Sequence, residues 1–423
     1  MRLVLTLLFL TFVSSTLAQS DRFSNLNFLV DKALLNNASI ASTKLKIQAA
    51  EAQVSGAGAL PDPKVNLGIF AQEVETRVGP QKWKFGFSQK FPGRGKRSTS
   101  VLIGQKKVGE LQALLKAKEA SLRKQVTQAF LEYHYLARAT VVTKDSLRLL
   151  EGLEKVALAT YRAGRGTHSS VIKLQIEEGR LRDRLRTMQE RRASQSANLE
   201  SLLNTETPHP LPWPEEIVSS EAPLPSDEIL IEQLQEYNPQ LLMLRKQLET
   251  ARAINRQSHL ARRPDVTVGL EYIRTNEAAM AGVKDSGKDP IIAKVAWNLP
   301  IRTGRYRAAQ QSTELGASAI KKELEQRGRQ LSAKIKTAAF RVQDSRRKIR
   351  LYKETLIPKA EQALTVGRRS FATGGKDFLD VIDTERMLLE FQLSLERARV
   401  DEALARAEVF ELIGQVPAKG AHQ

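Results

Sequence analysis

The sequence predicts a mainly α-helical protein with a small β part, in which one structural unit occurs twice. Three observations lead to this fold class. Aromatic residues make up only 6% of the chain and charged residues 27%, a composition typical of long helices. Short segments with alternating apolar residues interrupt the helical pattern in each half of the chain. The order of features in the first half then recurs in the second half.

The N-terminus has the pattern of a secretory signal peptide. Arg2 supplies a positive charge, residues 3–13 are apolar, and Ala18 ends a run of small residues at a plausible cleavage point. We therefore expect a signal peptide over 1–18 and an exported protein; the alternative is a short buried helix. No later segment reaches the roughly 20 apolar residues of a membrane-spanning helix, so any membrane span would have to be formed by β-strands.

Charge and composition argue against several functional classes. The 423 residues include no Cys, which excludes a disulfide framework, a thiolate metal site and a cysteine nucleophile. The formal net charge is +19, but the basic residues alternate with acidic ones along the helices, which is typical of a solvated helical face. The five His residues are scattered. We expect no catalytic residue, no metal site, no cofactor and no nucleic-acid partner.

The duplication is clearest near the end of each half. Residues 160–175, TYRAGRGTHSSVIKLQ, align without gaps to residues 370–385, SFATGGKDFLDVIDTE, at an offset of 210 (374 − 164). Six prolines separate the two halves, which predicts a linker rather than a helix. The predicted domains are a signal peptide (1–18), a first repeat (19–204), a Pro-rich linker (205–226), a second repeat (227–416) and a C-terminal tail (417–423).

Each repeat is expected to contain the same elements in the same order. A helix comes first, then two alternating strands, a very long helix with the apolar spacing of a coiled coil, a Gly turn and a return helix. Pro358 falls within the second long helix and predicts a kink or local break. The expected helices span, in chain order, 27–58, 97–160, 169–203, 227–261, 305–370 and 377–415.

The strands alternate between apolar and polar residues. In the first repeat Trp83, Phe85 and Phe87 alternate with Lys82, Lys84 and other polar residues, so one face of the strand is apolar. In the second repeat Val295 and Trp297 alternate with Lys294 and Asn298. Segments of about ten residues suit tilted transmembrane strands, and a soluble, half-buried hairpin is the alternative.

With these features in place, the chain resembles the TolC family of outer-membrane efflux channels. The sharpest matches are Phe371-Ala372-Thr373-Gly374, followed by Asp380-Val381-Ile382-Asp383, and Leu356-Ile357-Pro358-Lys359-Ala360. The segments 60–63 and 89–97 are similar to the branch associated with heavy-metal resistance, the CusC- and CzcC-like channels.

The resemblance implies a homotrimer in the cell outer membrane. Each chain would give four transmembrane β-strands to a shared 12-strand barrel and its coiled-coil helices to an α-barrel in the periplasm. The Pro-rich linker would lie in a belt around the middle of that α-barrel. The implied partners are a periplasmic adaptor, an inner-membrane pump and outer-membrane lipid. Four strands alone cannot satisfy their edges in lipid, which agrees with a trimer.

The resemblance also implies which residues carry the function. Asp380 and Asp383, three apart on one helix face, would line the channel constriction and attract cations; a solvated helix face is the alternative. The two Gly turns would dock the adaptor or would be plain hairpin turns. Their residues are Gly164, Arg165, Gly166, Gly374, Gly375 and Lys376. If Trp83, Phe85, Phe87, Val295 and Trp297 face lipid, then Lys82, Lys84, Lys90 and Lys294 face the lumen and make it positively charged.

The chain departs from the family at the gate. Family gates often pair a tip Tyr and Arg with an acid of the first repeat, but here the matching positions hold Phe371, Lys376 and Ser170. The predicted function is an outer-membrane conduit of a tripartite efflux pump, with no enzymatic activity. A periplasmic adaptor or a structural coiled-coil protein of the envelope is the alternative. The sequence does not identify the cargo: metal cations, drugs and polypeptides all remain open.

Overall fold

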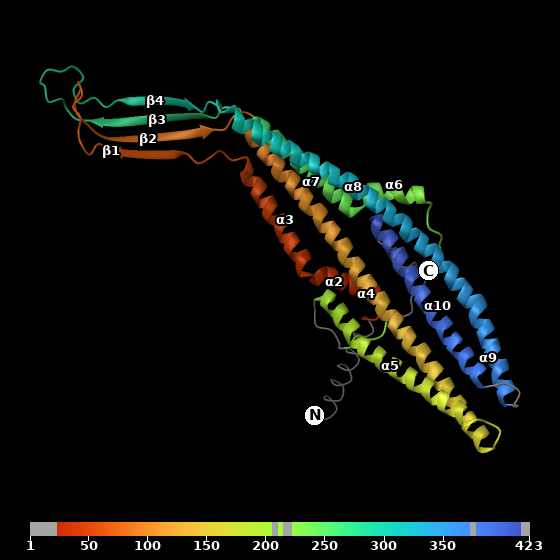
Figure 1. Cartoon of the computed structure of the whole chain (residues 1–423). Coiled ribbons are helices and arrows are strands. Elements are labelled where there is room, and N and C mark those ends of the chain that lie inside the picture. The colour runs from red at the N-terminus through yellow and green to blue at the C-terminus, as the bar shows by residue number, and fades with distance from the viewer. Residues whose placement is uncertain (1–22, 205–209, 215–221, 373–377, 416–423) are drawn as a thin grey trace, which may run out of the picture. The chain divides into compact units, whose positions relative to one another are not determined.

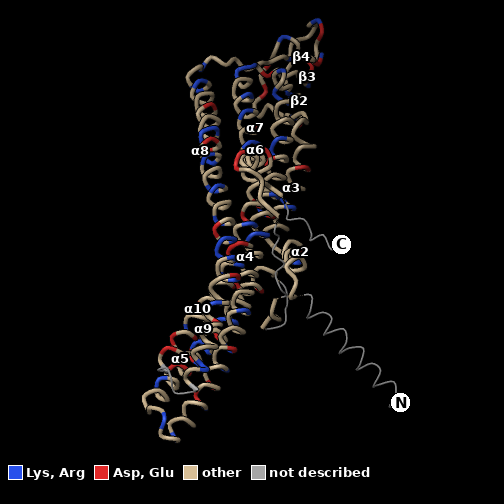
Figure 2. Tube along the Cα trace, turned by 90° about the vertical axis from the view of Figure 1, so that its right-hand side faces the viewer, with Lys and Arg blue, Asp and Glu red and all other residues tan. Residues whose placement is uncertain are grey.

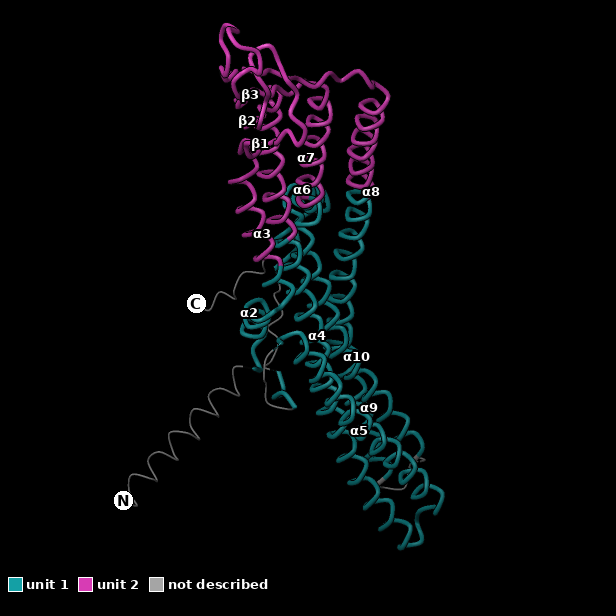
Figure 3. Tube along the Cα trace, turned by 90° about the vertical axis from the view of Figure 1, so that its left-hand side faces the viewer, with its two compact units in different colours: residues 1–42, 115–241, 327–423 teal, residues 43–114, 242–326 magenta. Residues whose placement is uncertain are grey.

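The computed structural model consists of long helices and one four-stranded sheet (Figure 1). It describes residues 23–204, 210–214, 222–372 and 378–415, so the expected signal peptide lies outside the described residues. The chain forms two compact units (Figure 3): the first contains 1–42, 115–241 and 327–423, and the second contains 43–114 and 242–326. Each unit draws on both halves of the chain.

The first helical stretch of each repeat is divided in two by an asparagine. The helices are α2 (Leu26–Asn36) and α3 (Ala38–Ala57), and α6 (Asp227–Tyr237) and α7 (Pro239–Leu260). Asn37 Oδ1 accepts hydrogen bonds from the N–H groups of Ser39 and Ile40, and Asn238 Oδ1 accepts from Gln240 and Leu241. Each asparagine thus caps the start of a new helix, so the helical stretches expected over 27–58 and 227–261 are present, but each consists of two helices.

The four strands form an antiparallel sheet in the order β1-β2-β3-β4, all within the second unit. They span Lys64–Ile69, Gln81–Phe91, Val266–Thr275 and Ile291–Trp297. β2 pairs with β3 across the two repeats, with Phe85 opposite Tyr272, and the register shifts between Gln81 and Trp83. β1 and β4 lie at the edges of the sheet.

The long helices follow the strands. α4 runs over Lys96–Arg162 and α5 returns over His168–Leu203; in the second repeat these correspond to α8 (Thr303–Arg350), α9 (Ile357–Ala372) and α10 (Phe378–Leu412). Lys and Arg are interspersed with Asp and Glu along them (Figure 2). Among the described residues, no helix carries an apolar stretch long enough to cross a membrane.

The helix expected over 305–370 is continuous but changes its hydrogen bonding before Pro358. Residues Leu351–Leu356 form a π-helical segment, and the N–H of Ile357 bonds to the carbonyl of Tyr352, five residues earlier. Pro358 has no N–H to continue the α-helical pattern, and a wider turn accommodates its ring. The predicted local break at Pro358 is therefore a π segment and not an end of the helix.

The first unit contains two hydrophobic clusters that hold its helices together. One joins α4, α5, α9 and α10 around Leu174, Leu364, Val381 and Ile382. The other joins α2, α4, α5 and α10 around Leu29, Val126 and Leu199. Because these side chains are almost fully buried, each contributes on the order of 2 kcal/mol to packing.

Candidate channel and docking site

One face of the sheet is apolar and exposed. The register places Phe87 opposite Val65 on β1 and Leu270 on β3, and Leu270 opposite Ala293 on β4, so most apolar residues of the four strands share this face. Most of them are more than a third exposed; Trp297, for example, is 59% exposed. This apolar face comprises Val65, Leu67, Ile69, Trp83, Phe85, Phe87, Phe91, Val266, Val268, Leu270, Ile291, Val295 and Trp297. Contiguous apolar surface of this kind marks contact with a membrane or another protein.

The opposite face is polar, and its lysines are paired. Lys84 lies 3.6 Å from Glu271, and Lys294 forms an ion pair with the same carboxylate. Lys90 lies 2.9 Å from Asp265, and Lys82, at the register shift, pairs with Glu73. Three carboxylates therefore compensate most of the charge of the four lysines singled out from the sequence. The acids were visible in the sequence, but their pairing depends on the register between β2, β3 and β4.

Asp265 links the start of β3 to the turn after β2. Its carboxylate accepts hydrogen bonds from Lys96 Nζ at 2.7 Å and from the N–H of Gly93 at 2.8 Å, besides the pair with Lys90. Burial opposes ionisation of this group, but these three donors outweigh it and lower the pKa of Asp265 to about 2. The aspartate thus fixes the strand-to-helix turn to the neighbouring strand.

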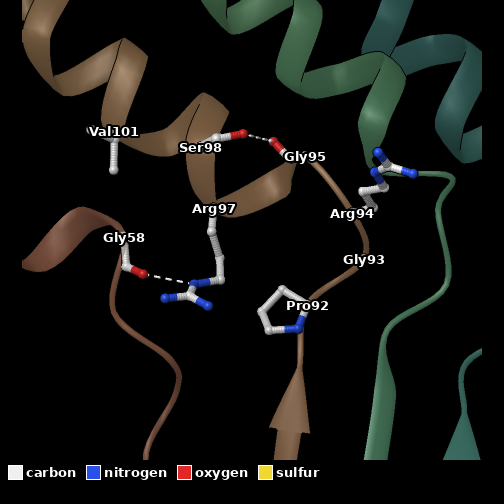
Figure 4. Close-up of a pocket in the computed structure, with 8 residues that line it drawn as sticks. All are labelled: Gly58, Pro92, Gly93, Arg94, Gly95, Arg97, Ser98 and Val101. Atoms are coloured by element: carbon white, nitrogen blue, oxygen red, sulfur yellow. Dashed lines mark hydrogen bonds between the residues drawn. The ribbon is translucent and has the colours of Figure 1, made fainter.

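The segment Gly93-Arg94-Gly95-Lys96 is a strand-to-helix turn. β2 ends at Phe91, α4 begins at Lys96, and the N–H of Lys96 bonds to the carbonyl of Gly93. Gly95 has φ +88°, and a Cβ on Gly93 would lie 2.7 Å from the carbonyl oxygen of Pro264, so neither position accepts a larger residue without strain. A cavity of about 480 Å³ opens beside this turn (Figure 4), lined by Gly58, Pro92, Gly93, Arg94, Gly95, Arg97, Ser98 and Val101.

The first predicted docking tip is a tight turn between α4 and α5. Gly164 has φ +73°, and the N–H of Arg165 returns to the carbonyl of Thr160, which ends α4. Thr167 accepts a hydrogen bond from the N–H of Ser170 and caps α5. Arg165 is exposed. The residues of the second tip, Gly374, Gly375 and Lys376, lie outside the described residues.

The two candidate constriction residues are exposed on α10. Val381 and Ile382 between them are buried against α5 and α9, and this burial directs Asp380 and Asp383 away from the helix packing. Asp383 lies 3.3 Å from Arg386, and its side chain is 67% exposed. The pattern Asp-Val-Ile-Asp therefore presents both carboxylates on one surface of the first unit.

Arg386 connects these acids to the first repeat. It forms an ion pair with Glu177 on α5, which also lies 2.8 Å from Arg180. The hydrogen bond from Arg386 is the main reason that the pKa of Glu177 is lowered, and the same bond raises the pKa of Arg386. The alignment of the two repeats does not match Glu177 with Arg386. The sequence therefore gave no signal for this link between α5 and α10.

A second carboxylate lies within the helix packing. Glu385 is 4% exposed, and its Oε1 accepts a hydrogen bond from Ser146 Oγ on α4 at 2.7 Å. Burial raises the pKa of Glu385, with Ser146 and Arg368 opposing. The α4, α5 and α10 helices thus meet through both ionic and hydrophobic contacts next to Asp383.

The described parts of the Pro-rich linker are fixed to the first unit. Tyr133 and Arg192 both donate to the carbonyl of Leu211, and Tyr133 stacks on Trp213 with ring centroids 4.9 Å apart. At the other end, Arg346 and Arg406 donate to the carbonyl of Ala222. The linker is therefore anchored to α4 and α5 at one end and to α8 and α10 at the other.

Within the described residues, no group of three or more His, Asp or Glu side chains is placed to hold a metal ion. The structure instead presents three surface features: an apolar sheet face, an exposed acidic pair and a tight helical tip. These three features are contact surfaces of a protein that is built mainly from helices.

Comparisons with known proteins identify the class further. The profile of the outer membrane efflux protein family matches residues 29–205 and 230–415, and the chain belongs to this family. It is 21% identical to the cobalt-zinc-cadmium resistance protein CzcC of Cupriavidus metallidurans over 369 residues, which cover 85% of this chain and 82% of CzcC. It is 27% identical to the outer membrane protein TolC of Vibrio cholerae over 195 residues, which cover 45% and 44% of the two chains.

Solved structures show the same fold. The outer membrane protein VceC of Vibrio cholerae superposes with a TM-score of 0.75 at 19% identity, covering 92% of this chain and 96% of VceC. CusC superposes with a TM-score of 0.78 at 16% identity, covering 92% of each chain. The protein is thus an outer-membrane efflux channel with its helical part in the periplasm, and not an enzyme, an adaptor or a structural coiled-coil protein. The family resemblance inferred from the sequence is confirmed.

Proposed function

We propose that three copies of this chain form one conduit through the outer membrane. Each copy contributes its four strands to a closed sheet of twelve (3 × 4) and its helices to a periplasmic tunnel. Family members are trimeric channels that work with a periplasmic adaptor and an inner-membrane pump. The observation that carries the proposal is the sheet itself, which exposes a whole apolar face and has two open edges at β1 and β4. In lipid, unpaired edges are too costly, and neighbouring copies would satisfy them.

The lipid-facing residues are Trp83, Phe85, Phe87, Val295 and Trp297 in this proposal. Aromatic residues lie at both ends of the apolar face: Trp83 packs near Tyr272 at one end, and Phe91 and Trp297 are placed at the other. The eight residue-to-residue steps from Trp83 to Phe91 (91 − 83) span about 27 Å along the strand, close to the roughly 25 Å apolar band between the aromatic girdles of membrane strands. Lys82, Lys84, Lys90 and Lys294 then face the lumen.

The turns that follow the long helices meet the adaptor. We assign docking to the two tips, Gly164-Arg165-Gly166 and Gly374-Gly375-Lys376. The tight turn at Gly164 and the exposed Arg165 support this assignment for the first tip. Charge reversal at Arg165 should weaken adaptor binding, and reversal at Arg184 on α5, which is also exposed, should not.

Asp380 and Asp383 form the constriction in this proposal. Threefold symmetry multiplies the exposed pair to six carboxylates (3 × 2) around the axis, a ring that attracts cations. The likeness to CzcC, a cobalt-zinc-cadmium resistance protein, favours divalent metal cations as cargo.

The gate of this channel differs from that of its family. Phe371 stands where family gates often have a tyrosine hydroxyl, and Ser170 stands where they often have an acidic side chain. The link from Glu177 to Arg386 beside Asp383 is the ionic contact that instead joins α5 to α10 there.

The experiment is single-channel recording of the purified protein in planar lipid bilayers. Current should flow without any energy source, and divalent cations added on the side of the helices should block it. The double variant Asp380→Ala, Asp383→Ala should weaken this block, whereas Asp183→Ala, Glu190→Ala on α5 removes the same charge and should leave it unchanged. Absence of conductance would contradict the conduit, and unchanged block in the first variant would contradict the acidic ring.

A further inference from the structure

Charge is distributed unevenly between the two ends of the sheet. All four connections between strands and helices lie at one end, because β1 and β3 begin there and β2 and β4 end there. Together with the first residues of α4 and α8, these connections comprise residues 58–63, 92–97, 261–265 and 298–305, which hold seven basic and two acidic residues, a net charge of +5. The two loops at the other end, 70–80 and 276–290, hold three basic and five acidic residues, a net charge of −2.

Most of the basic residues at the junction end have no acidic partner. Six of the seven are arginines, and among the described residues none of the six lies within 4 Å of a carboxylate. They are Arg94, Arg97, Arg262, Arg263, Arg302 and Arg305, called here the arginine collar. Of the two acids, Asp265 is already engaged by Lys90 and Lys96, and Asp62 is exposed. In the same unit, Lys106 and Lys246 both pair with Glu249.

The collar arginines are spread around the turn instead of converging on one point. Arg97 lies between Gly58 and Pro92 beside the cavity, and its Nε donates to the carbonyl of Gly58 at 2.7 Å, which leaves its Nη groups available (Figure 4). Arg94 lies on the other side of the turn, and its carbonyl accepts a hydrogen bond from Arg263. Separate guanidinium groups suit a row of anionic groups better than a single bound anion.

The collar also adjoins the apolar face. Phe91 and Trp297, at the same end of the strands, are exposed on that face, only a few residues in sequence from Arg94 and Arg302. A molecule that contacts both regions has an apolar body and an anionic head. Since the helices lie in the periplasm, this end of the sheet is at the periplasmic surface of the membrane.

We propose that the arginine collar binds the phosphate headgroups of anionic phospholipids in the periplasm-facing leaflet of the outer membrane, while their acyl chains lie against the apolar face. Guanidinium groups bind phosphate through paired hydrogen bonds, and basic residues next to a membrane are attracted to anionic lipid. This proposal rests on the proposed contact between the sheet and lipid, and it adds a preference for anionic phospholipids.

The test measures lipid selectivity at Trp297. The full-length protein carrying Trp83→Phe and Trp213→Phe retains Trp297 as its single tryptophan. It is reconstituted into phosphatidylcholine bilayers containing either brominated phosphatidylcholine or brominated phosphatidylglycerol, because bromine quenches tryptophan only on contact. Brominated phosphatidylglycerol should quench several-fold more effectively at equal mole fraction, with about fivefold enrichment for each engaged arginine. This preference should fall as salt is raised.

Variants separate the collar from general charge effects. Arg94→Gln, Arg97→Gln, Arg302→Gln should abolish the preference for phosphatidylglycerol, and the same positions changed to Lys should retain much of it. Arg184→Gln, Arg191→Gln on α5, where both residues are exposed, should leave it intact. Equal quenching by the two lipids in the parent protein would overturn the collar alone. No quenching by either lipid would overturn the lipid-facing sheet, and with it the collar.

Discussion

The two units of the molecule differ in whether their apolar residues are buried or exposed. The first unit buries Leu174, Leu364 and Val381 among its own helices, whereas the sheet of the second unit leaves Phe85, Leu270 and Val295 exposed on one face. Both regions follow the hydrophobic period of their secondary structure. The helical unit is therefore packed by contacts within one chain, while the apolar face of the sheet is left exposed by its own chain.

The largest expected effect is on the sheet. Phe87→Arg places a charge in the middle of the apolar face, and a charge at that depth costs about 2–4 kcal/mol per copy in a membrane strand. We expect loss of the assembled protein from the outer membrane, measured by fractionation and by resistance to protease. Ser88→Arg, on the opposite face of the same strand, is the matched control and should assemble. Equal loss in both variants would remove the distinction between the two faces.

The next effect is in the helical unit. Leu174→Ala leaves a cavity in the cluster that joins α5 to α10, and we expect a loss of about 3 kcal/mol in the free energy of unfolding of the periplasmic part. Chemical denaturation followed by helical circular dichroism measures it. Ile172→Ala, at an exposed position of the same helix, should cost less than 1 kcal/mol. Similar losses for both would contradict the packing described for this unit.

The junction between strands and helices should show a pH dependence. The pKa of Asp265 is about 2 in the folded protein, below its unfolded value, so its stabilisation is complete above about pH 4 and is lost as the pH falls through 2. We expect Asp265→Asn to lose about 2 kcal/mol at pH 7. Its difference from the parent protein should shrink toward pH 2. Thermal unfolding of both proteins across this range measures the difference, and a constant difference would refute the role of the ionised carboxylate.

The smallest expected effect is at the link between α5 and α10. Arg386 is partly exposed, so Arg386→Gln should cost only about 1 kcal/mol of stability at neutral pH. The lowered pKa of Glu177 means that this contribution disappears as the pH falls below the usual carboxylate range. A double-mutant cycle with Glu177→Gln measures the coupling. Additive effects in the cycle would show that the pair is not coupled.

Sequence patterns predicted the features that are determined by residues close together in the chain. The alternation around Phe85 gave the apolar face, and the Gly turn at 164 marked the end of α4. The breaks at Asn37 and Asn238 were missed although their signals are local: asparagine is a preferred cap, and Pro239 follows the second at the first helical position. The link from Arg386 to Glu177 and the pairing of Lys294 with Glu271 were not predictable, because they depend on how distant segments pack.

The central claim is that three copies share one lipid-embedded sheet. The most direct test is the mass and shape of the particle extracted in detergent from outer membranes, by native mass spectrometry and electron microscopy. We predict three chains in an elongated, hollow particle. A monomeric particle, or a protein released into the aqueous fraction without detergent, would contradict the claim.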